Sequence, residues 1–259
     1  MMNKNTRIYR EALQKIVDFP ASKNTHGISF EFLSFRTEFS PEGHIAGSSE
    51  KYIKNELDWY LSQDRNIKGH PGIETNKVWQ NCAAEDGSIN SNYGWCIFSK
   101  ENYEQFEMAC RSIEKDPSTK QAVMVYTRPS INIDWNDGEH AKHDMICTIY
   151  VNLLLRDGKL IYIVHMRSND IWYGLRNDLA WHQYVFKRAV KWLNGHNIKC
   201  EPSKIIWNAD SMHLYERNVL DVKKWLEAND GFDPVDTEII AERYNKKTGP
   251  PVTEALHYA

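Results

Sequence analysis

Cys147 is the residue whose type and surroundings first suggest a chemical reaction. It stands in the segment HDMICTIYV, where a polar stretch gives way to a hydrophobic run. A cysteine attacks other molecules as the thiolate, and a nearby cation lowers the pKa of the thiol from about 8.5. The alternative is a structural cysteine in the core, which is the commoner state for an arbitrary cysteine. The choice depends on which charged groups the fold brings to Cys147.

Arg167 is the cation that the hairpin pattern places near that thiol. Two hydrophobic runs flank Asp157-Gly158, a dipeptide typical of a type I′ turn between antiparallel strands. Pairing the strands about this turn brings their outer ends together, and it places Cys147 opposite Ser168 with Arg167 adjacent. With Arg167 this close, a reactive thiol and a structural core cysteine are equally good interpretations of Cys147.

Polar side chains are dense in the segment that starts at Met166 and reads MRSNDIWYGLRNDLAW. An arginine fork beside a serine hydroxyl suits a phosphate group, so Arg167 and Ser168 are candidate phosphate ligands. A surface loop in which Arg167 forms a salt bridge with Asp170 would have the same composition. Asp178 precedes an apolar helical pattern and would by default cap that helix, which competes with ligand binding for its carboxylate.

Glu56, His213 and Tyr215 are further candidates. Glu56 lies beside the apolar stripe of a helical pattern, which is an unusual position for a carboxylate. His213 and Tyr215 stand two residues apart in NADSMHLYERN, a spacing that suits two donors to sugar hydroxyls.

A zinc site and a cysteine hydrolase are alternative interpretations of Cys147. His140, His143 and Cys147 have ligand-like spacing, but a metal would require a helix or a knuckle here, and a fourth ligand is not evident. We therefore expect solvated loop histidines and no metal. A hydrolase would use His143 or His165 as its base, although no local motif supports it.

The composition limits the class of partner. The chain has 259 residues, 41% of them hydrophobic and 26% charged, which is typical of a globular protein with a core. A net charge of −3 lacks the positive field that holds a polynucleotide, but it does not oppose binding of a mononucleotide. The aromatic content of 12% offers flat walls for flat ligands.

The cysteine usage and the hydropathy predict a soluble cytoplasmic protein. The 5 cysteines are scattered and form no C-x-x-C motif, which indicates a reducing compartment rather than a disulfide framework. The polar segment MMNKNTRIYR does not resemble a signal peptide, and no window approaches the ~20 apolar residues of a membrane helix. We expect no membrane partner.

Helical and strand patterns follow one another without repeats or long linkers, which predicts one domain over residues 1–259. The strand patterns are joined mainly by turns, so we expect a largely antiparallel sheet packed with helices in an α+β fold. The expected helices are 7–19, 50–61, 101–113, 178–194 (ended by Gly195) and 213–228, and the expected strands are 28–35, 121–127, 146–155, 159–166 and 204–208.

Several short sequence motifs, taken in their order along the chain, together resemble the thymidylate synthase family. They are NELDWYL, KVWQ, GSINSNYGW, VYTRPS, MICT, MRSND, YGLRNDLAW, IIWN and HLY, and they extend over nearly the whole chain. NSNYGW, YTRPS, MRSND and RND-x-AW are similar, as whole words, to the bacteriophage members of the family that hydroxymethylate deoxycytidylate (dCMP). The resemblance implies a thymidylate synthase-like fold with a large, mostly antiparallel or mixed sheet at a homodimer interface.

The resemblance also implies that Cys147 is a nucleophile that adds to carbon 6 of a pyrimidine. Carbon 5 would then attack the methylene group of methylene-tetrahydrofolate, the expected co-substrate, with dCMP as the expected substrate. Glu56 would organise water and proton transfers around the ring, and Tyr93 would lie near the nucleophile. The binding residues that the resemblance implies are Arg167 and Ser168 for phosphate, His213 and Tyr215 for the sugar 3′-hydroxyl, and Trp79 and Asp170 for the folate.

Asp178 stands where thymidylate synthases carry an asparagine that reads uracil. A carboxylate only accepts hydrogen bonds, so it suits the amino group of cytosine and a protonated ring nitrogen. Against uracil it would oppose a carbonyl oxygen, and a buried mismatch of that kind can discriminate by as much as ~10⁴. Asp178 is therefore predicted to select cytosine.

Two features depart from the family pattern. Lys120 and Gln121 stand in KDPSTKQA, where the family has two adjacent arginines that reach the phosphate across the dimer interface. Lys120 keeps a charge, but the planar fork is lost. Thr148 follows the nucleophile in place of the histidine of the synthases. Residue chemistry leaves open a methyl product, CMP as substrate, and a homologue that binds nucleotides without catalysis.

Overall fold

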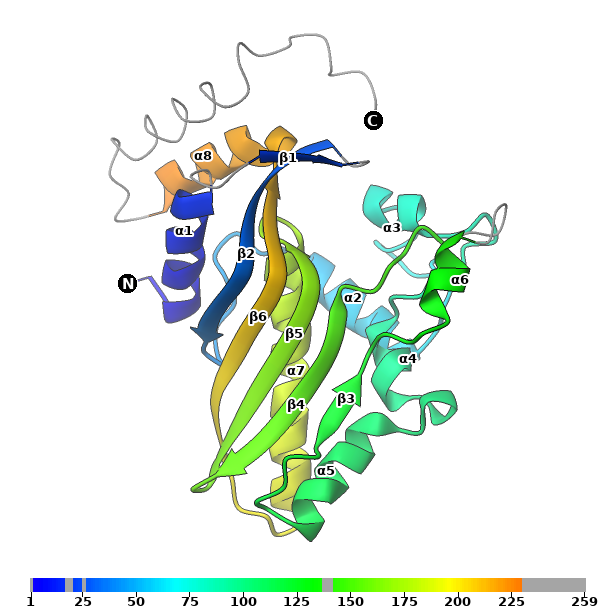
Figure 1. The fold of residues 1–259 in the computed structure, drawn as a ribbon, viewed down its shortest axis with the longest axis vertical. Coiled ribbons are helices and arrows are strands. Elements are labelled where there is room, and N and C mark those ends of the chain that lie inside the picture. Colours follow the sequence, from blue (N-terminus) through cyan, green and yellow to red (C-terminus); the bar gives the residue numbers. More distant parts are fainter. Residues whose placement is uncertain (1, 17–20, 25–26, 137–141, 230–259) are drawn as a thin grey trace.

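The protein is built on a mixed sheet of six strands, in a computed structural model that describes residues 2–16, 21–24, 27–136 and 142–229 (Figure 1). The strands lie in the order β1-β2-β6-β5-β4-β3. β5 and β6 are parallel, and the other neighbouring pairs are antiparallel, which confirms the expected α+β class. The strands are β1 (Ala21–Asn24), β2 (Gly27–Phe39), β3 (Val123–Val125), β4 (Thr148–Arg156), β5 (Lys159–Asp170) and β6 (Glu201–Tyr215).

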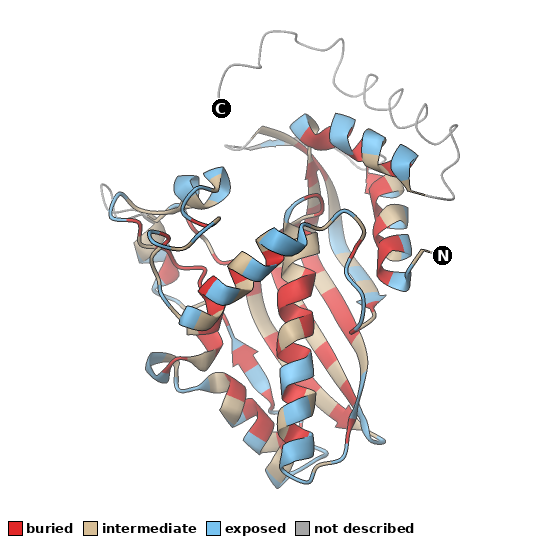
Figure 2. Ribbon diagram, turned by 180° about the vertical axis from the view of Figure 1, so that it is seen from behind, coloured by how far each residue is buried: buried red, intermediate tan, exposed pale blue. Residues whose placement is uncertain are grey.

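Helices cover one face of this sheet. The 22-residue helix α7 (Gly174–Gly195) lies behind the sheet in Figure 1 and in front of it in Figure 2, where its sheet-facing residues are buried. The other helices are α1 (Lys4–Ile16), α2 (Glu50–Ser62), α3 (Lys77–Cys82), α4 (Tyr93–Phe98), α5 (Gln105–Lys115), α6 (Ile131–Asn136) and α8 (Val219–Ala228), with 3₁₀ turns at Lys100–Asn102 and Glu216–Asn218.

α7 is the crossover that joins the parallel pair. Parallel strands require a long connection, and here the chain leaves β5, returns along α7 and enters β6. Alternate residues of β5 are buried against this helix, and burial of each such apolar side chain contributes about 1.5–3 kcal/mol. The buried side chains of this layer include Leu160, Tyr162, Val164 and Met166 from β5 and Leu175, Leu179, Phe186 and Leu193 from α7.

The hairpin between β4 and β5 has the predicted turn but a shifted register. Asp157 and Gly158 have φ angles of 50° and 70°, as a type I′ turn requires. A β-bulge then interrupts the pairing between Thr148 and Tyr150. The prediction that Cys147 lies opposite Ser168 is therefore wrong, because the bulge inserts an extra residue into β4. Cys147 instead pairs with Arg167, whose backbone N–H donates to the Cys147 carbonyl at 2.9 Å.

The start of α7 also differs from the prediction. The helix begins at Gly174, so Asp178 lies inside it and does not cap it. The apolar core extends the helix towards its N-terminus, since Leu175 is fully buried. Gly195 belongs to the helix, and His196 is the C-cap residue, so the predicted end is one residue too early.

The segment from His213 to Tyr215 is a strand, so the predicted helix 213–228 begins too early. β6 continues to Tyr215 because both of its neighbours pair with it there, with Asp170 opposite His213 and Phe30 opposite Leu214. Only after the 3₁₀ turn does α8 begin, at Val219. Long-range pairing thus overrides a helical pattern in this segment.

The remaining boundaries differ by smaller amounts. Tyr103 and Glu104 adopt left-handed backbone angles, so the helix predicted from residue 101 begins only at Gln105. The N-terminal helix begins earlier than predicted, at Lys4, and is described as far as Ile16, whereas residues 17–19 of that prediction lie outside the described part of the chain. The strands at 28–35 and 204–208 are longer than predicted, and the strand at 121–127 is shorter.

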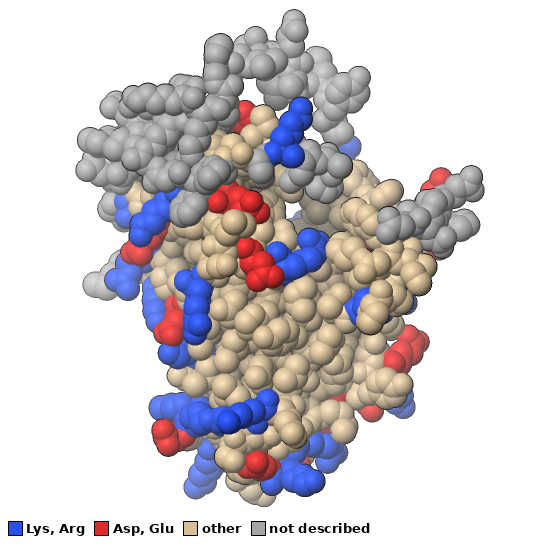
Figure 3. Space-filling view, viewed as in Figure 1, with Lys and Arg blue, Asp and Glu red and all other residues tan. Residues whose placement is uncertain are grey.

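Among the residues that the structure describes, no helix covers the other face of the sheet. β5 places Ile161, Ile163 and His165 on it, each partly exposed. Figure 3 looks onto this face and shows few charged side chains over its middle. In the described part of the chain, no helix is both long enough and apolar enough to cross a membrane.

Candidate active site

Cys147 and Arg167 are in direct contact at one end of the β4–β5 hairpin. An Nη2–H of Arg167 donates to Cys147 Sγ at 3.7 Å, so the proximity expected from the hairpin pattern is confirmed. The guanidinium is held in place by the backbone, since its Nε donates to the Ile146 carbonyl at 3.0 Å and Nη2 donates to the Met145 carbonyl. The segment that leads into the thiol therefore positions its cation as well.

The Cys147 thiol nevertheless holds its proton in this arrangement. Burial raises its pKa to about 11, and Arg167 only partly offsets that effect. The negative charges of Asp178, Asp144 and Asp170 act in the same direction as burial. The expected activation by Arg167 thus has the predicted sign, but desolvation outweighs it. Formation of the thiolate requires a change that substrate binding would have to supply.

Glu56 ends a chain of three hydrogen-bonded side chains. Trp79 Nε1–H donates to the hydroxyl of Tyr52 at 2.8 Å, and that hydroxyl donates to Glu56 Oε1 at 2.9 Å. Burial, and secondly the charge of Asp178, raise the pKa of Glu56 to about 8. A carboxyl group with such a pKa can give and take protons near neutral pH, which suits a general acid or base.

Tyr52 was missed in the sequence, although its position offered a signal. It precedes Glu56 by one helical turn on α2, and residues at that spacing lie on one face of a helix. Ser49 caps α2 through a bond from the Tyr52 backbone N–H, which fixes where the helix begins. Tyr52 connects the predicted folate residue Trp79 to the predicted proton-transfer residue Glu56.

Asp178 lies on α7, is partly exposed, and directs its carboxyl group at β5. Its Oδ2 accepts a hydrogen bond from Asn169 Nδ2 at 2.7 Å. Burial raises the pKa of Asp178 to about 7, the Asn169 bond lowers it, and the charge of Asp170 raises it again. A proton is therefore available on this carboxyl near neutral pH, which refines the acceptor-only picture of Asp178 drawn from its sequence.

Tyr93 lies beside the residue that follows the thiol. The backbone N–H of Thr148 donates to the Tyr93 hydroxyl at 3.4 Å, and the Tyr93 ring stacks on Tyr60 with centroids 5.2 Å apart. Thr148 in turn lies 3.5 Å from His182 Nε2 through its Oγ1. The position next to Cys147 is thus occupied by a fully buried threonine that contacts a buried histidine of α7.

The predicted sugar and phosphate ligands lie together on β5 and β6. Ser168 Oγ and His213 Nδ1 are 3.4 Å apart, and the rings of His213 and Tyr215 are in edge contact with centroids separated by 5.0 Å. The predicted folate residue Asp170 pairs with His213 in the parallel register, and its Oδ1 accepts the backbone N–H of Trp172 at 2.8 Å.

Lys120 is the predicted site residue that the fold does not bring to the others. It is exposed at the entry to β3, and the carbonyl of neighbouring Thr119 accepts from Arg156, at the far end of β4. β4 spans 9 residues, which is roughly 30 Å of strand. Lys120 therefore stands at the opposite end of the sheet from Cys147 within one chain.

His143 and His165, two of the alternative histidines, pack against aromatic rings. The exposed His143 packs edge-on against Trp135, and His165 stacks on Tyr150 with ring centroids 4.4 Å apart. Among the residues that can be described, neither histidine is hydrogen-bonded to Cys147, and no group of three or more His, Cys, Asp or Glu could hold a metal ion. His140 lies outside the described residues.

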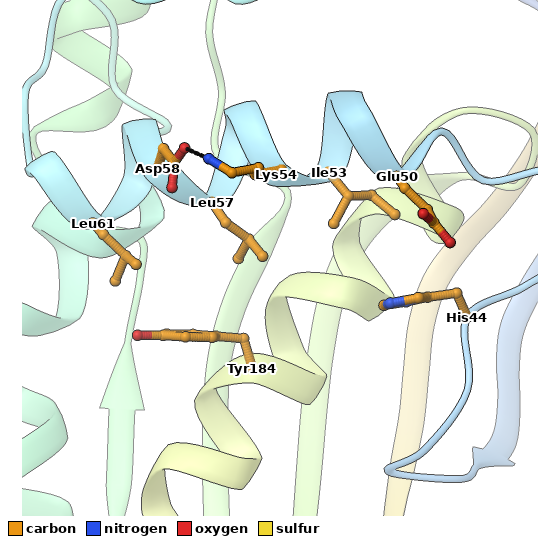
Figure 4. Close-up of a pocket in the computed structure, with 8 residues that line it drawn as sticks. All are labelled: His44, Glu50, Ile53, Lys54, Leu57, Asp58, Leu61 and Tyr184. Carbon is orange, nitrogen blue, oxygen red and sulfur yellow. Dashed lines mark hydrogen bonds and ion pairs between the residues drawn. The ribbon is translucent and has the colours of Figure 1, made fainter.

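A surface groove of about 400 Å³ runs between α2 and α7 and is separate from these residues. Figure 4 shows Ile53, Leu57 and Leu61 pointing from α2 towards Tyr184 of α7, with a Lys54–Asp58 ion pair on the rim. None of the predicted site residues lines this groove.

The chain belongs to the thymidylate synthase family, whose model matches residues 47–243. It is 39% identical over 199 residues to a deoxycytidylate 5-hydroxymethyltransferase of Enterobacteria phage T2, covering 76% of this chain and 77% of the relative. It is 41% identical over 179 residues to the phage T4 protein of that name, with coverages of 68% and 72%. A thymidylate synthase of Corynebacterium aurimucosum is 26% identical over 182 residues, with coverages of 67% and 62%.

Proposed function

We propose that this protein hydroxymethylates carbon 5 of dCMP, with methylene-tetrahydrofolate as the one-carbon donor and water as the last reactant. The observation that carries the proposal is the carboxyl group of Asp178, which lies within electrostatic range of the Cys147–Arg167 pair. Relatives that are 39% and 41% identical carry the name of this activity, which supports the choice of cytosine and of the hydroxymethyl product.

In the proposed reaction, Cys147 forms the first bond, to carbon 6, and that bond is the last to break. Its thiol loses a proton as Sγ bonds to carbon 6, and Arg167 stabilises the sulfur as it becomes negative. Carbon 5 becomes nucleophilic, bonds to the methylene carbon that the folate supplies, and loses its hydrogen as a proton while the bond between the methylene carbon and the folate nitrogen breaks and tetrahydrofolate leaves. Water then adds to the exocyclic methylene carbon while the bond between Sγ and carbon 6 breaks. The balance is dCMP, methylene-tetrahydrofolate and water giving 5-hydroxymethyl-dCMP and tetrahydrofolate.

Glu56 is the proposed proton-transfer residue, and Tyr93 orders the nucleophile end of the pocket. A pKa of about 8 lets Glu56 exchange protons with water around the base at neutral pH. The Tyr93 hydroxyl holds the backbone at Thr148, the residue after the nucleophile. Both side chains are buried, so neither has to be ordered when the substrate binds.

Trp79 and Asp170 fit the folate. Trp79 is partly exposed and packs against Trp59, with ring centroids 5.1 Å apart, which provides an aromatic wall for a flat heterocycle. Asp170 accepts the Trp172 amide through Oδ1, and its carboxylate has the acceptor capacity that the amino and ring N–H groups of a pterin require. Arg167, Ser168, His213 and Tyr215 are the proposed ligands of the phosphate and of the deoxyribose.

The product tests this proposal directly. The wild-type protein is incubated with dCMP and methylene-tetrahydrofolate, and the nucleotide product is identified by mass. We expect the mass of 5-hydroxymethyl-dCMP, no product from Cys147→Ala, and normal product from the matched variant Cys200→Ala. A methylated product would contradict the water step, and an active Cys147→Ala variant would contradict the role of the thiol.

We further propose that the protein, as one domain over residues 1–259, acts in the cytoplasm as a homodimer that binds neither polynucleotides nor membranes. The uncovered, sparsely charged face of the sheet suits a second copy (Figure 3). Lys120, remote from Cys147 in its own chain, would then supply positive charge to the phosphate site of the partner. Such sharing places one site across two chains.

Mixing two inactive variants tests this arrangement. If Lys120 acts across the interface, Lys120→Ala mixed with Cys147→Ala forms mixed dimers that contain one intact site. After subunit exchange, equal amounts should regain about one quarter of the wild-type activity, because half of the dimers are mixed and half of their sites are intact. Failure to regain activity in dimers shown to have exchanged would contradict a shared site.

A further inference from the structure

Asn169 is a buried amide that lies between two predicted ligands and carries no predicted role. It follows Ser168 on β5, and only 2% of its surface is exposed. Its Nδ2–H donates to Asp178 Oδ2 at 2.7 Å, whereas its own Oδ1 is buried without a hydrogen-bond partner. A buried amide oxygen left unpaired costs free energy, so this arrangement calls for a compensating role.

The contact between Asn169 and Asp178 depends on the lack of a side chain at Gly174. A Cβ atom at Gly174 would lie 3.1 Å from Asn169 Nδ2 and 3.3 Å from Asp178 Oδ2. Both distances are shorter than ordinary van der Waals contacts, so a side chain there would push on the pair. Gly174 is the first residue of α7, and it lets the helix approach β5 closely enough for the bond to form.

The two oxygens of Asp178 are therefore not equivalent. Oδ2 already accepts the Asn169 N–H, whereas Oδ1 has no hydrogen-bond partner among the residues that the structure describes. When the carboxyl group of Asp178 is protonated, Oδ2 is therefore the acceptor, and the proton resides on Oδ1. Asn169 thus gives a protonated Asp178 a fixed order of one donor and one acceptor.

We propose that Asn169 is a positioning residue that selects cytosine, because it determines which oxygen of Asp178 carries the proton and so fixes the hydrogen-bond pattern offered to the base. This inference rests on the proposed function. Cytosine presents an amino donor next to a ring acceptor, whereas uracil presents a carbonyl acceptor next to a ring N–H donor. A fixed donor–acceptor order complements only one of them.

Without Asn169, the proton could reside on either oxygen of Asp178, and the carboxyl group could match both bases. Near neutral pH this matters, because burial raises the pKa of Asp178 to about 7 and so keeps a proton available. The loss of Asn169 should therefore produce activity on dUMP, rather than only lowering the activity on dCMP. A residue with a merely structural role would not produce such a gain.

The test compares kcat/KM for dCMP and dUMP in the wild type, Asn169→Leu, Asn169→Ala and Gly174→Ala. We expect the ratio of dCMP to dUMP activity to fall by about tenfold or more in both Asn169 variants, with dUMP activity rising. Gly174→Ala should shift the ratio in the same direction. Binding of each nucleotide without folate, measured by calorimetry, should show the same change in preference.

Two variants on α7 are matched controls. Gln183 is a buried amide that donates to the carbonyls of Ser40 and Gly43 at 3.0 and 3.1 Å, so Gln183→Leu should lower the melting temperature without changing the base preference. Gly195→Ala meets no atom within 4 Å and should change neither property.

Three outcomes would overturn the inference. Unchanged discrimination in the folded Asn169 variants would do so, and so would equal loss of activity on both nucleotides. A wild-type protein that prefers neither nucleotide would overturn the proposed function and this inference together. The first two outcomes leave the proposed function intact, so the two failures are distinguishable.

Discussion

Asp144, which is buried, and Asp178, which is partly exposed, are two carboxyl groups near Cys147, and their hydrogen bonds differ sharply. Asp144 accepts from the backbone N–H groups of Asn90 and Ser91 at 2.8 and 2.6 Å and from the Ser91 hydroxyl at 2.6 Å. Asp178 accepts a single bond, from Asn169. Both carboxyls have raised pKa values because burial penalises their charge.

The difference indicates separate tasks for the two groups. Asp144 is saturated and ties the chain around Asn90 to the segment just before Cys147, which is a structural task. Asn90 also accepts a bond from Arg128 at 2.7 Å, so that arginine of the VYTRPS word belongs to the same structural cluster. Asp178 retains a free oxygen at the cost of stability, which is typical of a group that binds a ligand.

The largest expected effect is a change in base preference when Asp178, the carboxyl group with a free oxygen, is replaced. Asp178→Asn replaces an acceptor by an amide that suits uracil, so the preference should move from dCMP towards dUMP by as much as ~10⁴. Ratios of kcat/KM for the two nucleotides measure this change. Full retention of the cytosine preference in the variant would contradict the role assigned to Asp178.

The saturated carboxyl should matter more for stability. Asp144→Ala leaves buried donors unpaired and should lower the free energy of unfolding by about 3 kcal/mol or more. Asp178→Ala should lower it by less than ~1 kcal/mol, because it removes one bond and relieves the burial of a charge. Urea unfolding of both variants measures the difference. Equal losses would show that the two groups do not differ in structural task.

Glu56 is a third carboxyl group near the site, and it should make the stability of the protein depend on pH. Its folded pKa of about 8 lies above the reference value of 4.5, so its contribution to stability is complete below pH 4.5 and is lost as pH rises through about 8. The contribution of Glu56 to the free energy of unfolding should therefore fall by about 2 kcal/mol between pH 6 and pH 8. Glu56→Gln should flatten that decline in urea titrations, while kcat drops about 10²-fold or more. An equally steep decline in the variant would place the titrating group elsewhere.

The smallest effect is expected at His143. This exposed histidine contacts Trp135 rather than the thiol, so His143→Ala should change kcat/KM for dCMP by less than about twofold. Large loss of activity would instead favour a cysteine hydrolase with His143 as its base.

Local patterns were enough to predict the parts of the site that lie within one element or one tight turn. Asp157-Gly158 predicted the hairpin, and the hairpin predicted the contact between Cys147 and Arg167. The bulge that brings these two residues directly opposite one another left no local mark, because it depends on packing across the sheet.

Features that depend on distant parts of the chain were missed. β6 reaches Tyr215 through pairing with β2 and β5, against its own helical pattern. Asn169 stands in the MRSND word, but its role requires knowing that α7 begins at Gly174 and returns Asp178 to β5. The raised pKa values of Glu56 and Asp178 follow from burial, which no single segment of sequence determines.

Release of the carbon-5 hydrogen tests the central claim most directly. Tritium is placed on carbon 5 of dCMP or dUMP, and its transfer to water is measured with and without methylene-tetrahydrofolate. Addition of Cys147 to carbon 6, followed by bond formation at carbon 5, predicts release from dCMP that depends on the folate and is much slower from dUMP. Release from neither nucleotide, or faster release from dUMP, would contradict the account.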